Sequence, residues 1–269
     1  MKKIFYLFLI PILWIGCSKE TQPEPSPVGG TISVRSQGEL SNEPQGAAEI
    51  PGKATNRVAG DVLTYTFEAW TRDGEPRRVL HKTANGTLRE AAFEIALIPG
   101  NYDFLFWADY GKGAYTTDNL RNVAVAMTSG STPATYTPGS ERDAFACAST
   151  GVQWNGGNGV SATLMRPLAK LNMQNTTPFT AGDKRVSVSY RNVPTQYDVL
   201  TGTASDPQTV TLAFPNTTVG SVTVGEDFIF VPSEGTPVGL TIAVGDVEKG
   251  LDALPLKPNC QTNVTATFE

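Results

Sequence analysis

Apolar and polar residues alternate with a period of two along most of the chain. In residues 63–70, leucine, tyrosine, phenylalanine and alanine alternate with threonine, glutamate and tryptophan, and similar runs cover 93–97, 186–191, 240–244 and 264–268. This spacing predicts β-strands with one buried and one exposed face. Residues 102–107 carry apolar side chains on both faces. No stretch of about three turns shows the apolar stripe of a helix.

Turn signals separate these runs and divide the chain. The 26 glycines and 19 prolines fall largely between the predicted strands, where they favour turns. Many short strands with frequent turns predict an all-β fold built from β-sandwiches. Residues 155–159 hold three glycines and form the best internal joint. We therefore predict an N-terminal β-sandwich domain over residues 31–155 and a C-terminal one over 156–269.

The first residues follow another pattern. Lys2 and Lys3 precede an apolar run over residues 4–15, and Gly16 and Cys17 follow it. This is the pattern of a secretory signal, and the run is shorter than the roughly 20 residues that cross a bilayer. A small residue followed by cysteine is typical of a lipoprotein signal. We predict a signal peptide over residues 1–16 and acyl chains on Cys17; the alternative is an ordinary signal peptide with an incidental cysteine.

Residues 17–30 are predicted to be the lipidated cysteine and a flexible tether. Three prolines and no apolar run occur in this segment, so it lacks the residues needed for a packed core. At about 3.1 Å per residue it would hold the folded body roughly 40 Å from the lipid.

Composition excludes several classes of function. There are 21 basic and 26 acidic residues, with a net charge of −5, which disfavours nucleic acid as a partner. His81 is the only histidine, so multi-histidine metal sites and most Ser-His-Asp chemistry lack their parts. The glycine-rich residues 151–159 lack the lysine of a phosphate loop. We predict no enzymatic activity, no cofactor and no metal.

Two smaller groups of residues have more than one interpretation. Trp107, Tyr110 and Tyr115 could form a platform that stacks on sugars, but aromatic residues of a sandwich core are the favoured interpretation. Cys147 and Cys260 could pair in an exported protein. We favour two free thiols, because Cys147 lies in an apolar stretch.

Several stretches resemble the fimbrillin-like lipoproteins of Bacteroidetes, a family of fimbrial subunits and pilus anchors. Residues 97–110 resemble the "P-G-x-Y…W-A-D" strand pair of that family. Residues 166–171 resemble its "R-x-L-A-K" strand, and residues 254–265 its last strand pair. Residues 193–202 fit a subgroup with a fimbrial domain. The resemblance covers most of residues 31–269 in order.

The resemblance implies two transthyretin-like β-sandwich domains and a place in a type V pilus at the outer membrane, on the cell surface. In polymerising members, an Arg-specific protease removes an N-terminal segment, and a strand from the next subunit fills the groove. Arg57 is the first candidate for such a cleavage site. Arg35 is the second, although it falls inside the first predicted strand, residues 31–36.

We therefore predict a non-enzymatic surface lipoprotein, held on the outer membrane through acyl chains on Cys17. It would act in fimbrial assembly or adhesion by β-strand addition, with other fimbrial subunits as partners. The sequence stops directly after the last predicted strand, which fits an anchor or accessory protein at least as well as a stalk subunit. The alternative is a lipoprotein that binds a host or bacterial glycan or another ligand through residues 107–115.

Overall fold

The computed structural model describes residues 25–37, 62–87, 90–157, 159–233 and 235–269. Nearly all of its regular structure is β-strand, so the predicted all-β fold built from β-sandwiches is confirmed. The strands are β1 (Val28–Ser36), β2 (Val62–Thr71), β3 (Arg78–Thr87), β4 (Glu90–Leu97), β5 (Gly100–Asp109), β6 (Tyr115–Thr116), β7 (Val123–Val125), β8 (Ala144–Trp154), β9 (Ser161–Leu164), β10 (Leu168–Asn175), β11 (Val186–Asp198), β12 (Thr203–Phe214), β13 (Thr223–Phe230), β14 (Gly239–Val244), β15 (Val247–Leu251) and β16 (Gln261–Ala266). Two short 3-10 helices are η1 (Leu120–Asn122) and η2 (Ser140–Arg142).

Two sheets enclose the core of the N-terminal half. One has the order β4-β1-β9 and the other β3-β2-β5-β8. Strands β1 and β4 bury alternate residues, as a period of two requires when only one face of a sheet is covered. The shared core is rich in aromatic side chains, among them Phe67, Phe93, Phe104, Phe106 and Trp154.

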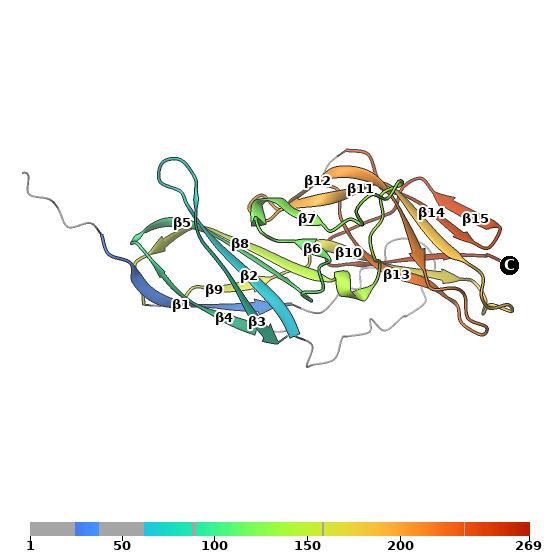
Figure 1. Ribbon diagram of the computed structural model, residues 1–269, viewed down its shortest axis with the longest axis horizontal. Coiled ribbons are helices and arrows are strands. Elements are labelled where there is room, and N and C mark those ends of the chain that lie inside the picture. Colours follow the sequence, from blue (N-terminus) through green and yellow to red (C-terminus); the bar gives the residue numbers. More distant parts are fainter. Residues whose placement is uncertain (1–24, 38–61, 88–89, 158, 234) are drawn as a thin grey trace, which may run out of the picture.

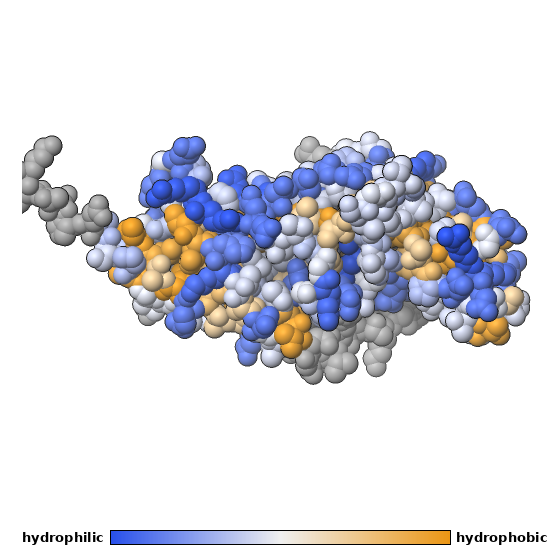
Figure 2. Space-filling model, in the orientation of Figure 1, coloured by the Kyte–Doolittle hydropathy of each residue, from blue (hydrophilic) through white to orange (hydrophobic). Residues whose placement is uncertain are grey.

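Strand β3 forms one edge of this half. Its side chains are exposed or half-buried along the whole strand, and hydrophilic residues cover the β2–β3 hairpin at the upper left of the molecule (Figure 2). Polar and charged side chains on an edge strand oppose pairing with other chains. This edge is therefore poorly suited to strand addition.

The C-terminal half also has two sheets. A three-stranded sheet has the order β13-β10-β16. A six-stranded sheet follows the order β15-β14-β11-β7-β6, and β12 pairs with β11 as well. Their core includes Leu171, Tyr190, Ile242 and Phe230. The two halves lie end to end along the long axis (Figure 1).

Strand β5 contributes to both cores. Phe104 and Phe106 face the N-terminal core, whereas Leu105 and Trp107 belong to the C-terminal core. The apolar side chains predicted on both faces of residues 102–107 are thereby explained, because each face is covered by a different set of strands. The two halves consequently share a strand as well as a connection.

The chain between β5 and β8 reaches into the C-terminal half. Strand β7 pairs with β11 through Gln196↔Ala124 and Tyr197↔Val123, and the backbone N–H of Thr211 donates to the carbonyl of Ala134. A single boundary near residue 155 does not describe this excursion. The division into domains 31–155 and 156–269 remains a prediction.

Candidate functional site

Strand β1 is the central strand of its three-stranded sheet. It pairs antiparallel with β4 from Val28↔Leu97 to Arg35↔Glu90, and parallel with β9 from Ser33↔Ser161 to Ser36↔Leu164. Removal of β1 would thus expose backbone donors and acceptors on both neighbours, together with an apolar slot. It starts three residues before the predicted first strand.

The inward face of β1 fills the N-terminal core. Ile32 and Val34 are 0% and 2% exposed, and Ser36 is buried beside them. The Tyr65 hydroxyl donates to the Thr87 carbonyl at 3.0 Å and lies 3.1 Å from Ser36 Oγ. Because the Tyr65 proton is already committed, Ser36 is the donor in that contact. Burial raises the pKa of Tyr65, so its hydroxyl stays protonated at neutral pH.

The predicted cleavage and lipidation residues fall in different places. Arg35 lies within β1 with its side chain exposed, and its backbone neighbours are Glu90 on β4 and Thr163 on β9. A protease would need to detach β1 locally before cutting there. Arg57 and Cys17 lie outside the described residues, and both assignments remain predictions.

The predicted sugar platform is placed mostly inside the molecule. Trp107 is fully buried and Tyr115 is 8% exposed, while Tyr110 is half-buried. The Trp107 ring packs edge-on against Tyr115, with centroids 5.1 Å apart, and its Nε1 donates to Asp109 at 2.7 Å. Neither Trp107 nor Tyr115 presents a ring face to solvent in this conformation. Their position agrees with the favoured interpretation, that of core aromatic residues.

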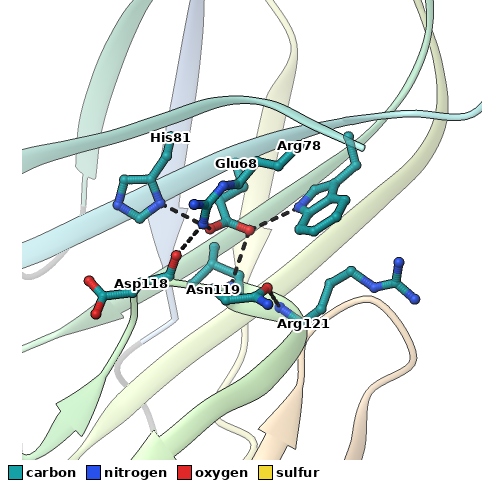
Figure 3. Close-up of polar contacts among 8 residues, drawn as sticks. Glu68, Arg78, His81, Asp118, Asn119 and Arg121 are labelled. Carbon is teal, nitrogen blue, oxygen red and sulfur yellow. Dashed lines mark hydrogen bonds and ion pairs between the residues drawn. The ribbon is translucent and has the colours of Figure 1, made fainter. Parts of the chain in front are cut away.

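A buried carboxylate, Glu68, organises a polar cluster between the halves (Figure 3). Its side chain is 0% exposed and accepts from Arg78 Nη1 at 2.6 Å, Trp70 Nε1 at 2.9 Å and the Leu120 backbone N–H at 3.1 Å. His81 Nδ1 lies 2.9 Å away. Arg78 also donates to the Asp118 carbonyl. With three donors on its two oxygens and no exposure to solvent, this carboxylate is held in a structural role.

The Glu68 cluster connects three parts of the fold. Glu68 and Arg78 belong to the β2–β3 hairpin, and Leu120 is the first residue of η1. The Leu120 carbonyl accepts a hydrogen bond from the N–H of Val199, the residue directly after β11. The cluster therefore ties the N-terminal sheet to the turn after β11. Sequence reasoning missed it, because the period of two placed Glu68 on a solvent-facing side of β2.

A second set of buried ion pairs lies where the halves meet. Arg166 Nε and Nη2 donate to the two carboxylate oxygens of Asp143 at 2.5 and 2.9 Å, and Nη1 donates to Asn259. Nearby, Arg142 Nε lies 3.4 Å from Asp227. Burial raises the pKa of Asp227, opposed by the charge of Arg142. These paired charges are expected to hold the two halves together, because removal of one partner would leave the other as an unpaired buried charge.

The described part of the chain offers no obvious centre for catalysis. Within it, no three His, Cys, Asp or Glu residues gather as metal ligands do. Cys147 is half-buried and Cys260 is buried, and both are free thiols. None of the helices in those residues has the length and apolar character needed to span a bilayer.

The fold defines a class of all-β proteins built from β-sandwiches, and comparisons with known proteins give its family. A family model described as "Family of unknown function (DUF6562)" matches residues 29–268. The chain belongs to that family. A search of the curated proteins returned no match.

Several solved structures from Bacteroidetes have the same fold. A candidate polysaccharide-binding protein from Bacteroides thetaiotaomicron is similar with a TM-score of 0.54 and 10% identity, over 83% of this chain and 78% of that one. A candidate adhesin from Bacteroides ovatus gives 0.53 and 9%, over 89% and 88%. The fimbrial anchor protein Mfa2 from Porphyromonas gingivalis gives 0.51 and 12%, over 89% and 90%. The resemblance to fimbrial proteins is confirmed at the level of the fold.

Proposed function

We propose that this chain is a non-enzymatic surface lipoprotein of a fimbrial system, which joins other subunits by β-strand addition at the position of β1. The observation that carries this proposal is the place of β1. It pairs on both sides, fills the core with alternate side chains, and is followed by the segment that contains Arg57. A cut in that segment would leave β1 held only by non-covalent contacts.

Two roles follow from one groove. If the segment after β1 is cut, β1 leaves together with the tether and Cys17, and a partner strand takes its place. If it is not cut, β1 remains and the acyl chains on Cys17 hold the protein on the outer membrane as an anchor. The first role acts through backbone pairing, the second through attachment to the membrane, and neither needs a chemical step.

Treatment of the folded protein with an Arg-specific protease tests the first role. A ladder of SDS-resistant species that is lost in Arg57→Ala but kept in Arg35→Ala would support assembly after cleavage at Arg57. A protein that yields no higher species with any cut between β1 and β2 is not a polymerising subunit. Cys17→Ala tests the anchor, because the variant should leave the membrane fraction; its retention there would exclude lipidation as the means of attachment.

A further inference from the structure

The N-terminal end of β1 passes unusually close to a buried aromatic ring. A Cβ added at Gly30 would lie 2.6 Å from Cη2 and 3.0 Å from Cζ2 of Trp154, and 3.2 Å from the backbone nitrogen of Gly157. Gly30 does not need glycine for its backbone conformation, because its φ lies outside the left-handed region. It needs glycine for space.

Trp154 cannot easily move away. It is 2% exposed, its Nε1 donates to the Val28 carbonyl at 3.2 Å, and its ring packs edge-on against Phe104 with centroids 6.1 Å apart. On the other side, the Gly157 N–H donates to the Gly29 carbonyl at 2.9 Å. The strand is thus clamped between a fixed ring and a backbone segment.

The rest of the inward face adds three further requirements. Ile32 and Val34 fill apolar space two and four residues after Gly30. Ser36, six residues after it, places a hydroxyl beside Tyr65. Ser36 is 4% exposed, so a larger residue at this position must displace buried neighbours, whereas a strand without the hydroxyl would leave a lone pair of Tyr65 unused.

We propose that this groove selects its partner strand by a glycine that faces Trp154, followed by apolar residues at the second and fourth positions and a small hydroxyl residue at the sixth. The proposal rests on the proposed function and names the partner of that same site. The complete pattern occurs once in this sequence, at Gly30–Ser36. The last strand of the chain lacks it, because Cys260 and Thr262 stand where the glycine would be required. The single occurrence is β1 itself, the strand that the incoming one replaces, so we assign the partner as a strand of a different subunit that carries the pattern.

Strand exchange in the full chain tests this. A specific protease site is inserted between residues 38 and 61, the folded protein is cut, and labelled ten-residue peptides compete with the resident β1. The peptide of residues 28–37 and its Gly29→Ala variant should enter equally, because a Cβ at Gly29 meets only the Ile95 carbonyl at 3.8 Å. The Gly30→Ala variant should bind roughly tenfold or more weakly. The peptide of residues 260–269 should not enter.

The outcomes separate the two claims. Equal entry of the Gly29→Ala and Gly30→Ala peptides would overturn the glycine rule and leave strand addition standing. Entry of the peptide of residues 260–269 as readily as the native one would overturn the assignment of a different subunit as partner. If no peptide replaces β1, even the native one, strand addition itself fails. A protein with Trp154→Phe, which shortens the ring, should discriminate less between the Gly30→Ala and native peptides than the wild type does; undiminished discrimination would overturn Trp154 as its source.

Discussion

Strands β1 and β10 occupy matching places in the two halves but are held very differently. Each is the centre of a three-stranded sheet, antiparallel to one neighbour and parallel to the last strand of its half: β4 and β9 for β1, β13 and β16 for β10. Strand β1 alternates between buried and exposed residues, whereas the first four residues of β10 are all buried. The same ladder thus serves a strand covered on one face and a strand covered on both.

The side chains around β10 add anchors that β1 lacks. Lys170 Nζ lies 3.1 Å from Glu226 on β13, the Phe268 N–H donates to Asn175 Oδ1, and Arg166 forms its buried pair just before the strand. Strand β1 has the Trp154 clamp, the contact between Ser36 and Tyr65, and an exposed bond from the Thr31 hydroxyl to Glu94 on β4 at 2.8 Å, but among the described residues no buried ion pair like that of Arg166. The proposal of strand addition requires that β1 opens more easily than β10, and this difference in contacts makes that comparison testable.

The largest expected effect comes from removing the buried ion pair of Arg166, which lies just before β10. Arg166→Ala removes the partner of buried Asp143 and should lower the free energy of unfolding by about 3–5 kcal/mol, measured by urea denaturation. The matched control is Arg191→Ala, because its pair with Asp252 is exposed and should contribute less than about 1 kcal/mol. Equal losses in the two variants would contradict the importance given to the buried pair.

Truncation within each strand sharpens the comparison. Leu171→Ala and Ile32→Ala both remove fully buried aliphatic groups and should each cost about 2–5 kcal/mol. Amide hydrogen exchange should separate them. Leu171→Ala should speed exchange throughout the molecule, whereas Ile32→Ala should speed it mainly in β1, β4 and β9. The same global pattern in both variants would show that β1 does not open by itself.

A smaller effect is expected at the end of β1. Ser36→Ala removes the donor to Tyr65 and should cost about 1 kcal/mol. The control is Ser33→Ala on the exposed face of the same strand, which should change stability by less than about 0.5 kcal/mol. Thermal unfolding measures both. If Ser33→Ala costs as much as Ser36→Ala, the contact with Tyr65 does not hold this end of β1.

The smallest expected effect concerns the hydrogen bonds of Glu269 at the far end of the C-terminal half. Glu269 accepts from the N–H and hydroxyl of Thr180 and from Lys184, and these bonds lower its pKa from 4.5 to about 2. A carboxylate whose pKa is lower in the folded state stabilises the protein at pH values above its unfolded-state pKa. This stabilisation is lost as the pH falls through the folded-state pKa. Glu269→Gln should therefore melt slightly below the wild type at pH 7, with a difference that disappears between pH 4.5 and 2. A difference that is constant with pH would exclude this ionic origin.

Sequence reasoning was most successful where one face of a strand is buried. The period of two predicted the strands in residues 63–70, 93–97 and 186–191, and the doubly apolar β5 was also expected. It was wrong for Glu68, which a period of two places in solvent and which the fold buries. The cause lies in the tertiary structure, because η1 and its neighbours cover the second face of β2. These residues lie about fifty positions further along the chain, so the local pattern around Glu68 does not predict the contact.

The candidate site was likewise predictable only in part. The sequence showed that residues 29–30 are two glycines, but not that Trp154 stands against only the second of them. The sequence favoured a core position for Trp107 over a ligand platform, but it did not show that Phe230 and Tyr197 from the other half pack around its ring. Residues whose role depends on contacts with residues far away in the sequence cannot be recognised from sequence spacing alone.

The direction of β1 has a mechanical consequence. The strand runs from the end of the molecule where the chain enters toward the middle, while the C-terminus lies at the opposite end (Figure 1). A pull applied between the two ends is thus directed along β1, across hydrogen bonds that lie roughly perpendicular to an antiparallel strand. Those bonds are loaded together in shear instead of being peeled one by one. A protein of this shape would resist tension through β1, even under the proposal that the same strand is exchanged when no force is applied.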